Sequence, residues 1–235
     1  MITDYHVHIG PFAGDLMFEP EDVARDMMSF GVDKWFYMST AFPCVPANYI
    51  EWFRGCVVRM NAVAPGKGFP VLWMTEEMLL KSDYYMDNRY VGIKIHERYA
   101  ALSPVALDSA FALAEEYGVP LWIHTGEFEQ CCASRYDAWC SRYTGVRVVL
   151  SHGRPLDQAV QMLKQHDQVM LDSAFMSLEQ MLFFAENGYA ARVLFGSDYP
   201  IQRYFFSDSD IGELYTQHLK SAHNLCRCTK LGLWV

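Results

Sequence analysis

Two histidines separated by one apolar residue, His6 and His8, lie in the N-terminal segment DYHVH of residues 4–8. In a β-strand, side chains two positions apart project to the same side of the sheet. If residues 2–9 form a strand, the two imidazoles lie side by side and supply half of the ligands of a zinc or iron site. Such a pair taken alone is more often two unrelated histidines, so the metal interpretation depends on ligands from elsewhere in the chain.

Further side chains that could bind a metal or move a proton come at the ends of later apolar segments. They are Lys94, His96, His124, His152 and Asp198. Each has a simpler explanation on its own: a turn carboxylate for Asp198, a buried ion-pair partner for Lys94, and a structural role for any single histidine. Their joint placement favours one shared metal site over a separate explanation for each residue.

The elements that must position these side chains alternate between strand and helix. We expect strands at residues 2–9, 34–40, 69–74, 91–96, 119–125, 146–151, 169–174 and 192–195. We expect helices at residues 19–30, 48–60, 103–117, 133–142, 155–165, 177–187 and 208–222, and residues 78–88 fit either a helix or a loop. Roughly eight strands alternating with helices predict a parallel α/β sheet, and eight repeats are the number of a TIM (β/α)8 barrel, here a short version.

This alternation does not by itself separate a closed barrel from an open, doubly wound sheet. The glycine-rich nucleotide-binding motifs of open sheets are absent from the sequence, which weakens that alternative. In a barrel, the carboxyl ends of all strands face the same mouth, where active sites lie. The predicted strand-end side chains would then meet at one rim.

Composition narrows the class of protein further. The 235 residues, 51% of them hydrophobic, fit a single domain over residues 1–235 with a sizeable core. The formal net charge of -9 argues against nucleic acid and anionic membranes as partners. The 7 cysteines are odd in number and scattered, which favours a reduced, cytoplasmic compartment over a disulfide framework. We find no signal peptide and no apolar run of membrane-spanning length.

The full set of motifs resembles the amidohydrolase superfamily of metal-dependent TIM barrels. It is most similar to the branch often called amidohydrolase 2, which includes hydrolases, lactonases and non-oxidative decarboxylases. The resemblance rests on five segments in the family's order: YHVH at 5–8, GIKIH at 92–96, PLWIHTG at 120–126, VLSHG at 149–153 and FGSDYP at 195–200. The set is specific for the superfamily and much less specific for a substrate.

The resemblance implies roles for the strand-end residues. His6, His8 and His124 would bind a divalent metal, usually one zinc ion, with Asp198 near or on it. His152 would contact the substrate or bind a second metal. A bound metal can lower the pKa of water and polarise a carbonyl, and Asp198 would take the proton of that water as general base. The metal and His152 would then hold the tetrahedral oxyanion.

Lys94 leaves two interpretations open. In two-metal members of the superfamily, a lysine at this strand end is carbamylated and bridges the metals, so Lys94 and His152 are candidate ligands of a second metal. We favour a one-metal site in which Lys94 remains an ammonium. Lys94, His96 and Arg98 are then candidate substrate-binding residues, and a cation at the mouth would suit an anionic substrate. Arg98 could equally be a solvated loop residue.

The sequence therefore predicts a metal-dependent hydrolase acting on a C–O or C–N bond of a small carbonyl compound: an amide, lactone or ester. The alternatives are a non-oxidative decarboxylase with the same ligands, a metal-binding barrel without turnover, and a metal-free α/β binding domain. The tail at 225–235 departs from the family pattern, which usually adds a further helix after the last strand. Its apolar end could pack on the barrel or on a partner subunit, so a homo-oligomer is one expectation.

Overall fold

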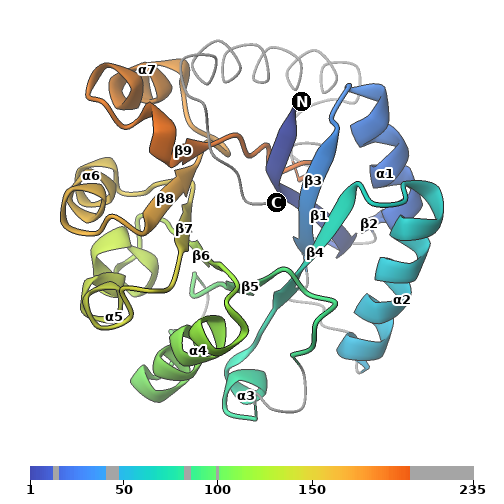
Figure 1. Ribbon diagram of the computed structural model, residues 1–235, viewed down its shortest axis with the longest axis horizontal. Coiled ribbons are helices and arrows are strands. Elements are labelled where there is room, and N and C mark those ends of the chain that lie inside the picture. Colours follow the sequence, from blue (N-terminus) through green and yellow to red (C-terminus); the bar gives the residue numbers. More distant parts are fainter. Residues whose placement is uncertain (13–15, 41–47, 82–85, 99–100, 202–235) are drawn as a thin grey trace.

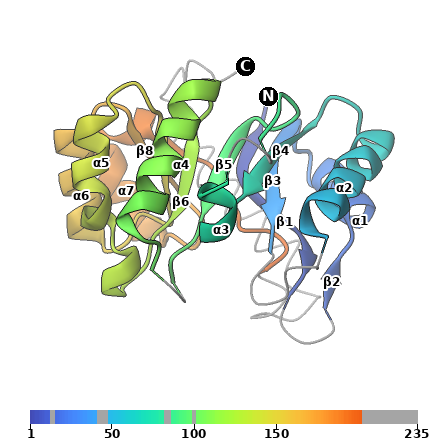
Figure 2. The ribbon, with the colours of Figure 1, turned by 90° about the horizontal axis from the view of Figure 1, so that it is seen from below.

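The computed structural model describes residues 1–12, 16–40, 48–81, 86–98 and 101–201. In this part of the chain, consecutive parallel strands curl into a ring (Figure 1). The parallel strands are β1 (Thr3–Pro11), β3 (Lys34–Ser39), β4 (Gly68–Trp73), β5 (Gly92–Ile95), β6 (Leu121–His124), β7 (Val148–Ser151), β8 (Val169–Asp172) and β9 (Val193–Leu194). The short strand β2 (Met17–Phe18) pairs antiparallel with the end of β1, at the end of the barrel opposite the N-terminus (Figure 2).

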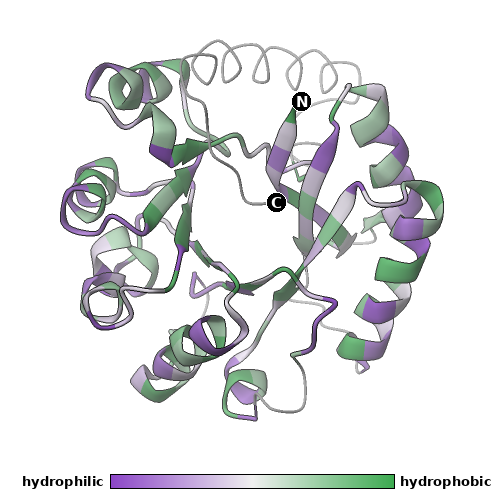
Figure 3. Cartoon of the chain, viewed as in Figure 1, coloured by the Kyte–Doolittle hydropathy of each residue, from purple (hydrophilic) through white to green (hydrophobic). Residues whose placement is uncertain are grey.

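Helices cover the outside of the ring (Figure 1). They are α1 (Pro20–Ser29), α2 (Tyr49–Val63), α3 (Glu76–Leu79), α4 (Pro104–Tyr117), α5 (Asp137–Arg142), α6 (Leu156–Gln165) and α7 (Leu178–Glu186). Hydrophilic and hydrophobic stretches alternate along them (Figure 3), as expected of helices with one face on the barrel and one toward solvent. The predicted start of α4 is confirmed: the Ser103 hydroxyl accepts a hydrogen bond from the Ala106 N–H, and Gly118 ends the helix in the left-handed conformation.

The ring closes where the chain after β9 meets β1. The Tyr5 N–H donates to the Phe195 carbonyl at 2.8 Å, and the Asp198 N–H donates to the His6 carbonyl at 2.8 Å. The fully buried Asp4 carboxylate strengthens this seam, since its Oδ1 accepts the N–H groups of both His6 and Ser197. These bonds carry the segment around Asp198 alongside β1, which brings residues 192 positions apart in the sequence into one site.

The barrel interior is filled by a cluster of apolar side chains from different strands. Its buried members are Tyr5, Phe36, Met38, Val71, Trp122, Val149 and Leu194. Gly92 on β5 leaves the space that the Trp122 indole occupies, because a Cβ there would lie 2.3 Å from the Trp122 ring. Because its interior is closely packed with side chains, the barrel holds the strand ends at its rim in fixed positions, as in other barrels of this type.

The expected short TIM barrel is thus confirmed, with two local differences. Residues 78–88, which the sequence left undecided, contribute only the end of the one-turn helix α3 and a non-helical stretch among their described residues. The expected helix at 133–142 divides into a 3-10 helix at Ala133–Tyr136 and the short α5.

The expected helix at 208–222 and the tail at 225–235 lie outside the described residues. Among the described residues, no helix combines the length and apolar character needed to cross a membrane.

Candidate metal centre

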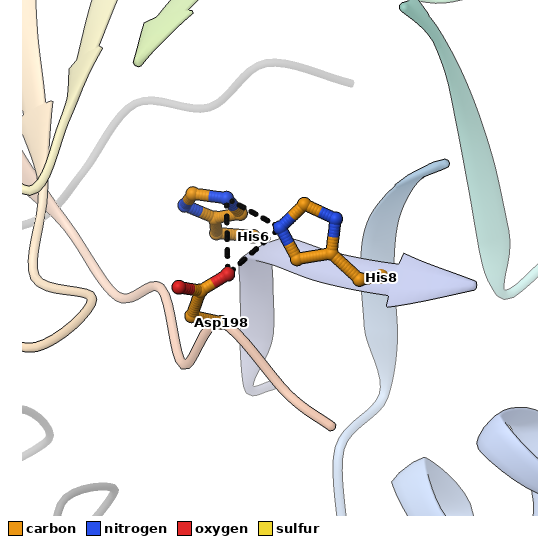
Figure 4. A group of neighbouring side chains, drawn as sticks. All are labelled: His6, His8 and Asp198. Carbon is orange, nitrogen blue, oxygen red and sulfur yellow. Dashed lines mark hydrogen bonds and ion pairs between the residues drawn. The ribbon is translucent and has the colours of Figure 1, made fainter. Parts of the chain in front are cut away.

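Three predicted ligands converge at the barrel rim. His6 and His8 project together from β1, and Asp198 reaches them from the segment after β9 (Figure 4). The His6 Nε2 atom lies 3.0 Å from His8 Nε2 and 3.4 Å from Asp198 Oδ1, and His8 Nε2 lies 2.7 Å from the same carboxylate oxygen. All three side chains are buried. Two imidazole nitrogens and one carboxylate oxygen therefore point at a common centre.

These separations suit a bound metal ion. Ligand atoms about 2.1 Å from a tetrahedral zinc lie about 3.4 Å from one another, which is close to the spacing of the three atoms here. Asp198 Oδ1 is buried without a well-aligned hydrogen bond, and the buried His8 Nδ1 has no hydrogen-bond partner among the described residues. A metal would satisfy the carboxylate oxygen, so the residues present fit the metal that the resemblance implies.

Asp172, at the end of β8, belongs to the same cluster although it was not among the predicted site residues. Its Oδ2 lies 2.9 Å from His6 Nδ1, and its Oδ1 accepts the N–H groups of His152 and Ala174, each at 3.1 Å. His6, His152 and Asp172 form a second group whose candidate ligand atoms lie within 4.8 Å of one another. A carboxylate ending an otherwise apolar strand is the same signal that identified the histidines, so the sequence did contain it.

The remaining predicted histidines lie together beside this centre. His152 Nδ1 lies 3.1 Å from the Ala174 carbonyl, which can only accept, so Nδ1 carries the proton and Nε2 presents a lone pair. That lone pair faces His124 Nδ1 at 3.2 Å, and the His124 ring stacks on His96 with centroids 3.9 Å apart. Among the described residues, His124 falls in neither group of candidate ligand atoms within 4.8 Å, so its role as a ligand of the first metal stays a prediction.

Burial favours the neutral form of His8, His96, His124 and His152. It is the main cause that lowers the pKa of His8, His96 and His124, and it lowers the pKa of His152 to about 4. Neutral imidazoles offer the lone pairs that metal binding requires. Burial alone would raise the pKa of Asp198, but the neighbouring His6 and His8 hold it well below its ordinary value.

The pKa of Asp172 is also held low, because His6 outweighs the effect of burial on that carboxyl group. Two ionised carboxylates in a buried site attract a divalent cation.

Lys94 is buried on β5 and donates from Nζ to the Ser151 hydroxyl at 2.7 Å. Burial lowers the pKa of Lys94 from 10.5 to about 8, although the charges of Asp172 and Asp198 act in the opposite direction. Arg98 differs, since it is exposed and lies over the Phe128 ring at 5.8 Å. The two predicted substrate-binding cations thus occupy contrasting environments, one inside the barrel and one on the loop above it.

Backbone strain is concentrated at the same rim. In the described chain, the non-glycine residues with positive φ are His152 at 69°, Phe175 at 56° and Asp198 at 61°. Left-handed backbone is unfavourable for such residues and persists where the surrounding structure enforces it, often at functional sites. Here it turns His152, directly after β7, and Asp198, in the segment after β9, toward the centre.

The fold and the site define a parallel barrel with histidine and carboxylate groups at the carboxyl ends of its strands that could hold a metal ion. The family model described as amidohydrolase matches residues 3–221. The chain therefore belongs to the amidohydrolase family, whose members are enzymes and are generally metal-dependent. A search of curated proteins returned no match.

Solved structures of amidohydrolases share this fold. A probable 2-pyrone-4,6-dicarboxylic acid hydrolase from Acinetobacter baumannii superposes with a TM-score of 0.61 at 11% identity, covering 95% of this chain and 98% of that one. The phosphotriesterase homology protein from Escherichia coli gives 0.60 at 13%, covering 93% and 98%. The 4-oxalomesaconate hydratase of Rhodopseudomonas palustris gives 0.57 at 14%, covering 96% and 95%. At such identities, the likeness establishes the fold and not the substrate.

Proposed function

We propose that this protein is a metal-dependent hydrolase that cleaves a C–O or C–N bond of a small carbonyl compound, an amide, lactone or ester. The observation that carries the proposal is the convergence of His6 Nε2, His8 Nε2 and Asp198 Oδ1 within 3.4 Å of one another. Family membership supports the same class of reaction.

In this proposal, one zinc ion is held by His6, His8 and Asp198, with His124 as a further candidate ligand. When bound, a divalent metal polarises the substrate carbonyl and lowers the pKa of water. Asp198 is the general base, because its ionised carboxylate lies at the centre and can accept the proton of the attacking water. His152 presents a lone pair from Nε2, so it orients a donor group, or it stabilises an oxyanion only after it has taken up a proton.

The proposed substrate is a small anion. The buried Lys94 ammonium lies beside the metal centre, and Arg98 and His96 follow it at the end of β5. A buried cation recognises a carboxylate more strongly than an exposed one, because water screens it less. The net charge of -9 gives the surface no general attraction for nucleic acid or anionic lipid, so we assign neither as a partner.

Lys94 also supports a second candidate, a non-oxidative decarboxylase. A buried ammonium within the site could bind the carboxylate that is lost, with the metal holding the rest of the substrate. The two reactions differ in product, since decarboxylation releases carbon dioxide whereas hydrolysis adds water and creates a new acid or alcohol. Carbamylated Lys94 in a two-metal site is the remaining variant of the proposal.

We also propose a cytoplasmic location, which rests on the cysteines. Cys56, Cys131, Cys132 and Cys140 all carry free thiols. Three of these four are buried, and free thiols persist in a reducing compartment. A homo-oligomer is compatible with the proposal, and size-exclusion chromatography with light scattering would measure it.

The test is a screen of zinc-loaded protein, purified without chelator or a histidine tag, against small lactones, esters, amides and carboxylic acids. His152→Asn is expected to keep its metal and lose turnover, and Asp198→Asn to lose turnover. His166→Asn is the matched control, because His166 pairs with Asp137 outside the site and should leave activity unchanged. Bound metal with no turnover on any substrate would instead support a metal-binding barrel.

A further inference from the structure

Asp172 lies between His6 on β1 and the loop that carries His152. It ends β8, its side chain has no exposed surface, and it touches His6 from β1 as well as the loop that carries His152. A Cβ on Gly196 would lie 3.0 Å from the Cβ atoms of both Asp172 and His6. The chain after β9 therefore packs directly on this pair and excludes water from it.

One carboxylate oxygen of Asp172 determines the proton position on His6. Asp172 Oδ2 lies 2.9 Å from His6 Nδ1, and an ionised carboxylate can only accept a hydrogen bond. A neutral His6 ring must therefore carry its proton on Nδ1. Its Nε2 then presents a lone pair toward His8 Nε2 and Asp198 Oδ1, which is the form that can bind a metal.

The other oxygen of Asp172 holds the loop that fixes His152. Asp172 Oδ1 accepts the backbone N–H groups of His152 and Ala174, each at 3.1 Å. The Ala174 carbonyl in turn accepts the proton of His152 Nδ1 at 3.1 Å. The loop held by Asp172 thus provides the acceptor that leaves a lone pair on His152 Nε2, facing His124.

We infer that Asp172 is a positioning residue that sets the tautomers of His6 and His152 together, and so prepares both for the reaction. This inference rests on the proposed function for its purpose and deepens it. Asp172 binds neither metal nor substrate in this account. It acts through the two imidazoles, which it joins across the barrel rim.

The substitution Asp172→Asn separates this role from packing, because asparagine has nearly the same shape. Two backbone N–H groups donate to Oδ1 of Asp172, and a backbone N–H can only donate. The side-chain carbonyl oxygen of the asparagine must therefore occupy that position. Its NH2 group then faces His6 Nδ1, which must become an acceptor. The proton of His6 moves to Nε2 and points into the metal centre. The variant should therefore fold but bind metal poorly.

Asp4→Asn is the matched control. Asp4 is also a fully buried carboxylate whose Oδ1 accepts two backbone N–H groups, those of His6 and Ser197. Its substitution removes the same charge from the same region, and the two hydrogen bonds named here come from backbone N–H groups rather than from an imidazole. Asp4→Asn should leave the tautomer of His6 unchanged.

The experiment measures the imidazole tautomers of the metal-free protein by long-range ¹H–¹⁵N correlation NMR, and the Zn²⁺ dissociation constant by competition with a chelator of known affinity. We expect the Nδ1–H form of His6 in the wild type and in Asp4→Asn, and the Nε2–H form in Asp172→Asn. Zinc binding to Asp172→Asn should weaken by roughly 10- to 100-fold, the usual effect of losing such a partner.

A wild-type His6 in the Nε2–H form would overturn the inference, whatever the variants do. An unchanged His6 tautomer in folded Asp172→Asn, or equal weakening of zinc binding in the two variants, would overturn it as well. The NMR readout needs neither metal nor turnover. A wild type that binds no zinc would thus defeat the proposed function while leaving the tautomer assignment independently testable.

Discussion

Replacing Lys94 by methionine should stabilise the metal-free protein while removing its activity. The Lys94 side chain is 2% exposed, and its Nζ donates to the Ser151 hydroxyl at 2.7 Å. Burial lowers its pKa from 10.5 to about 8. At about 1.4 kcal/mol per pKa unit, keeping the ammonium inside the fold at pH 7 costs about 3 kcal/mol.

Methionine fills a similar volume without a charge, and it gives up a hydrogen bond worth about 1 kcal/mol. The expected gain in the free energy of unfolding at pH 7 is therefore about 2 kcal/mol. For a chain of this size, that corresponds to a rise in Tm of roughly 4–8 °C. Turnover should fall at least tenfold, because the variant lacks both the proposed substrate cation and the amine that carbamylation would need.

The pH dependence gives the sharper test. Between pH 8 and 10.5, the unfolded chain keeps the proton on Lys94 whereas the folded chain has released it. The unfolded state then binds more protons, so the stability of the wild type rises with pH across this window. The methionine variant lacks that rise. The advantage of the variant should therefore be complete below pH 8 and should shrink toward pH 10.5.

The assay is urea denaturation of both metal-free proteins at several pH values, with Lys164→Met on the exposed face of α6 as a control for charge alone. The control should change stability by less than about 0.5 kcal/mol. A Lys94→Met protein that is less stable than the wild type at pH 7 would show that the buried ammonium does not destabilise the fold. So would a stability difference that does not change with pH.

Three further outcomes are expected. Gly92→Ala should lower the free energy of unfolding by about 1–3 kcal/mol in urea denaturation, because the new Cβ would lie 2.3 Å from the Trp122 ring. Gly55→Ala, in open space on α2, should be neutral or stabilising, and similar values for both variants would contradict the packing argument. Tyr199→Phe should lower the free energy of unfolding by about 1–3 kcal/mol, because it removes the hydroxyl that donates to the Asp26 carboxylate at 2.5 Å. An unchanged stability would show that this hydrogen bond does not stabilise the fold. Free zinc at one hundred times its dissociation constant should stabilise the protein by about 2.7 kcal/mol, a shift in Tm that calorimetry would detect and that a chelator should abolish.

The strands and the barrel could be predicted because their signals are local. Apolar runs such as VVLS in β7 are buried at every position, as parallel strands covered on both faces must be. The clustering of the histidines and Asp198 also followed from their strand-end positions, since parallel strands share one carboxyl edge. The closure of the ring could not be predicted from the sequence, because the hydrogen bonds between β1 and the chain after β9 join residues that are far apart along the chain.

Short elements escaped prediction for a different reason. The helix α3 is one turn long and β2 has two residues, so neither repeats a hydrophobic pattern long enough to be detected. The role of Asp172 was missed although its position carried a signal. It ends an apolar strand as the histidines do, but its importance comes from contacts with His6 and with the loop of His152, which only the folded chain brings together.

The proposed function requires that His6, His8 and Asp198 hold a catalytic metal. Elemental analysis of the protein, purified without chelator or a histidine tag, tests it most directly, beside a His6→Ala/His8→Ala control. We expect about one zinc or similar divalent metal per chain, lost in the control. A value near two would indicate a bridged site and make carbamylation of Lys94 the next question. No metal in the intact protein, even after reconstitution with zinc, would mean that these residues do not form a metal site.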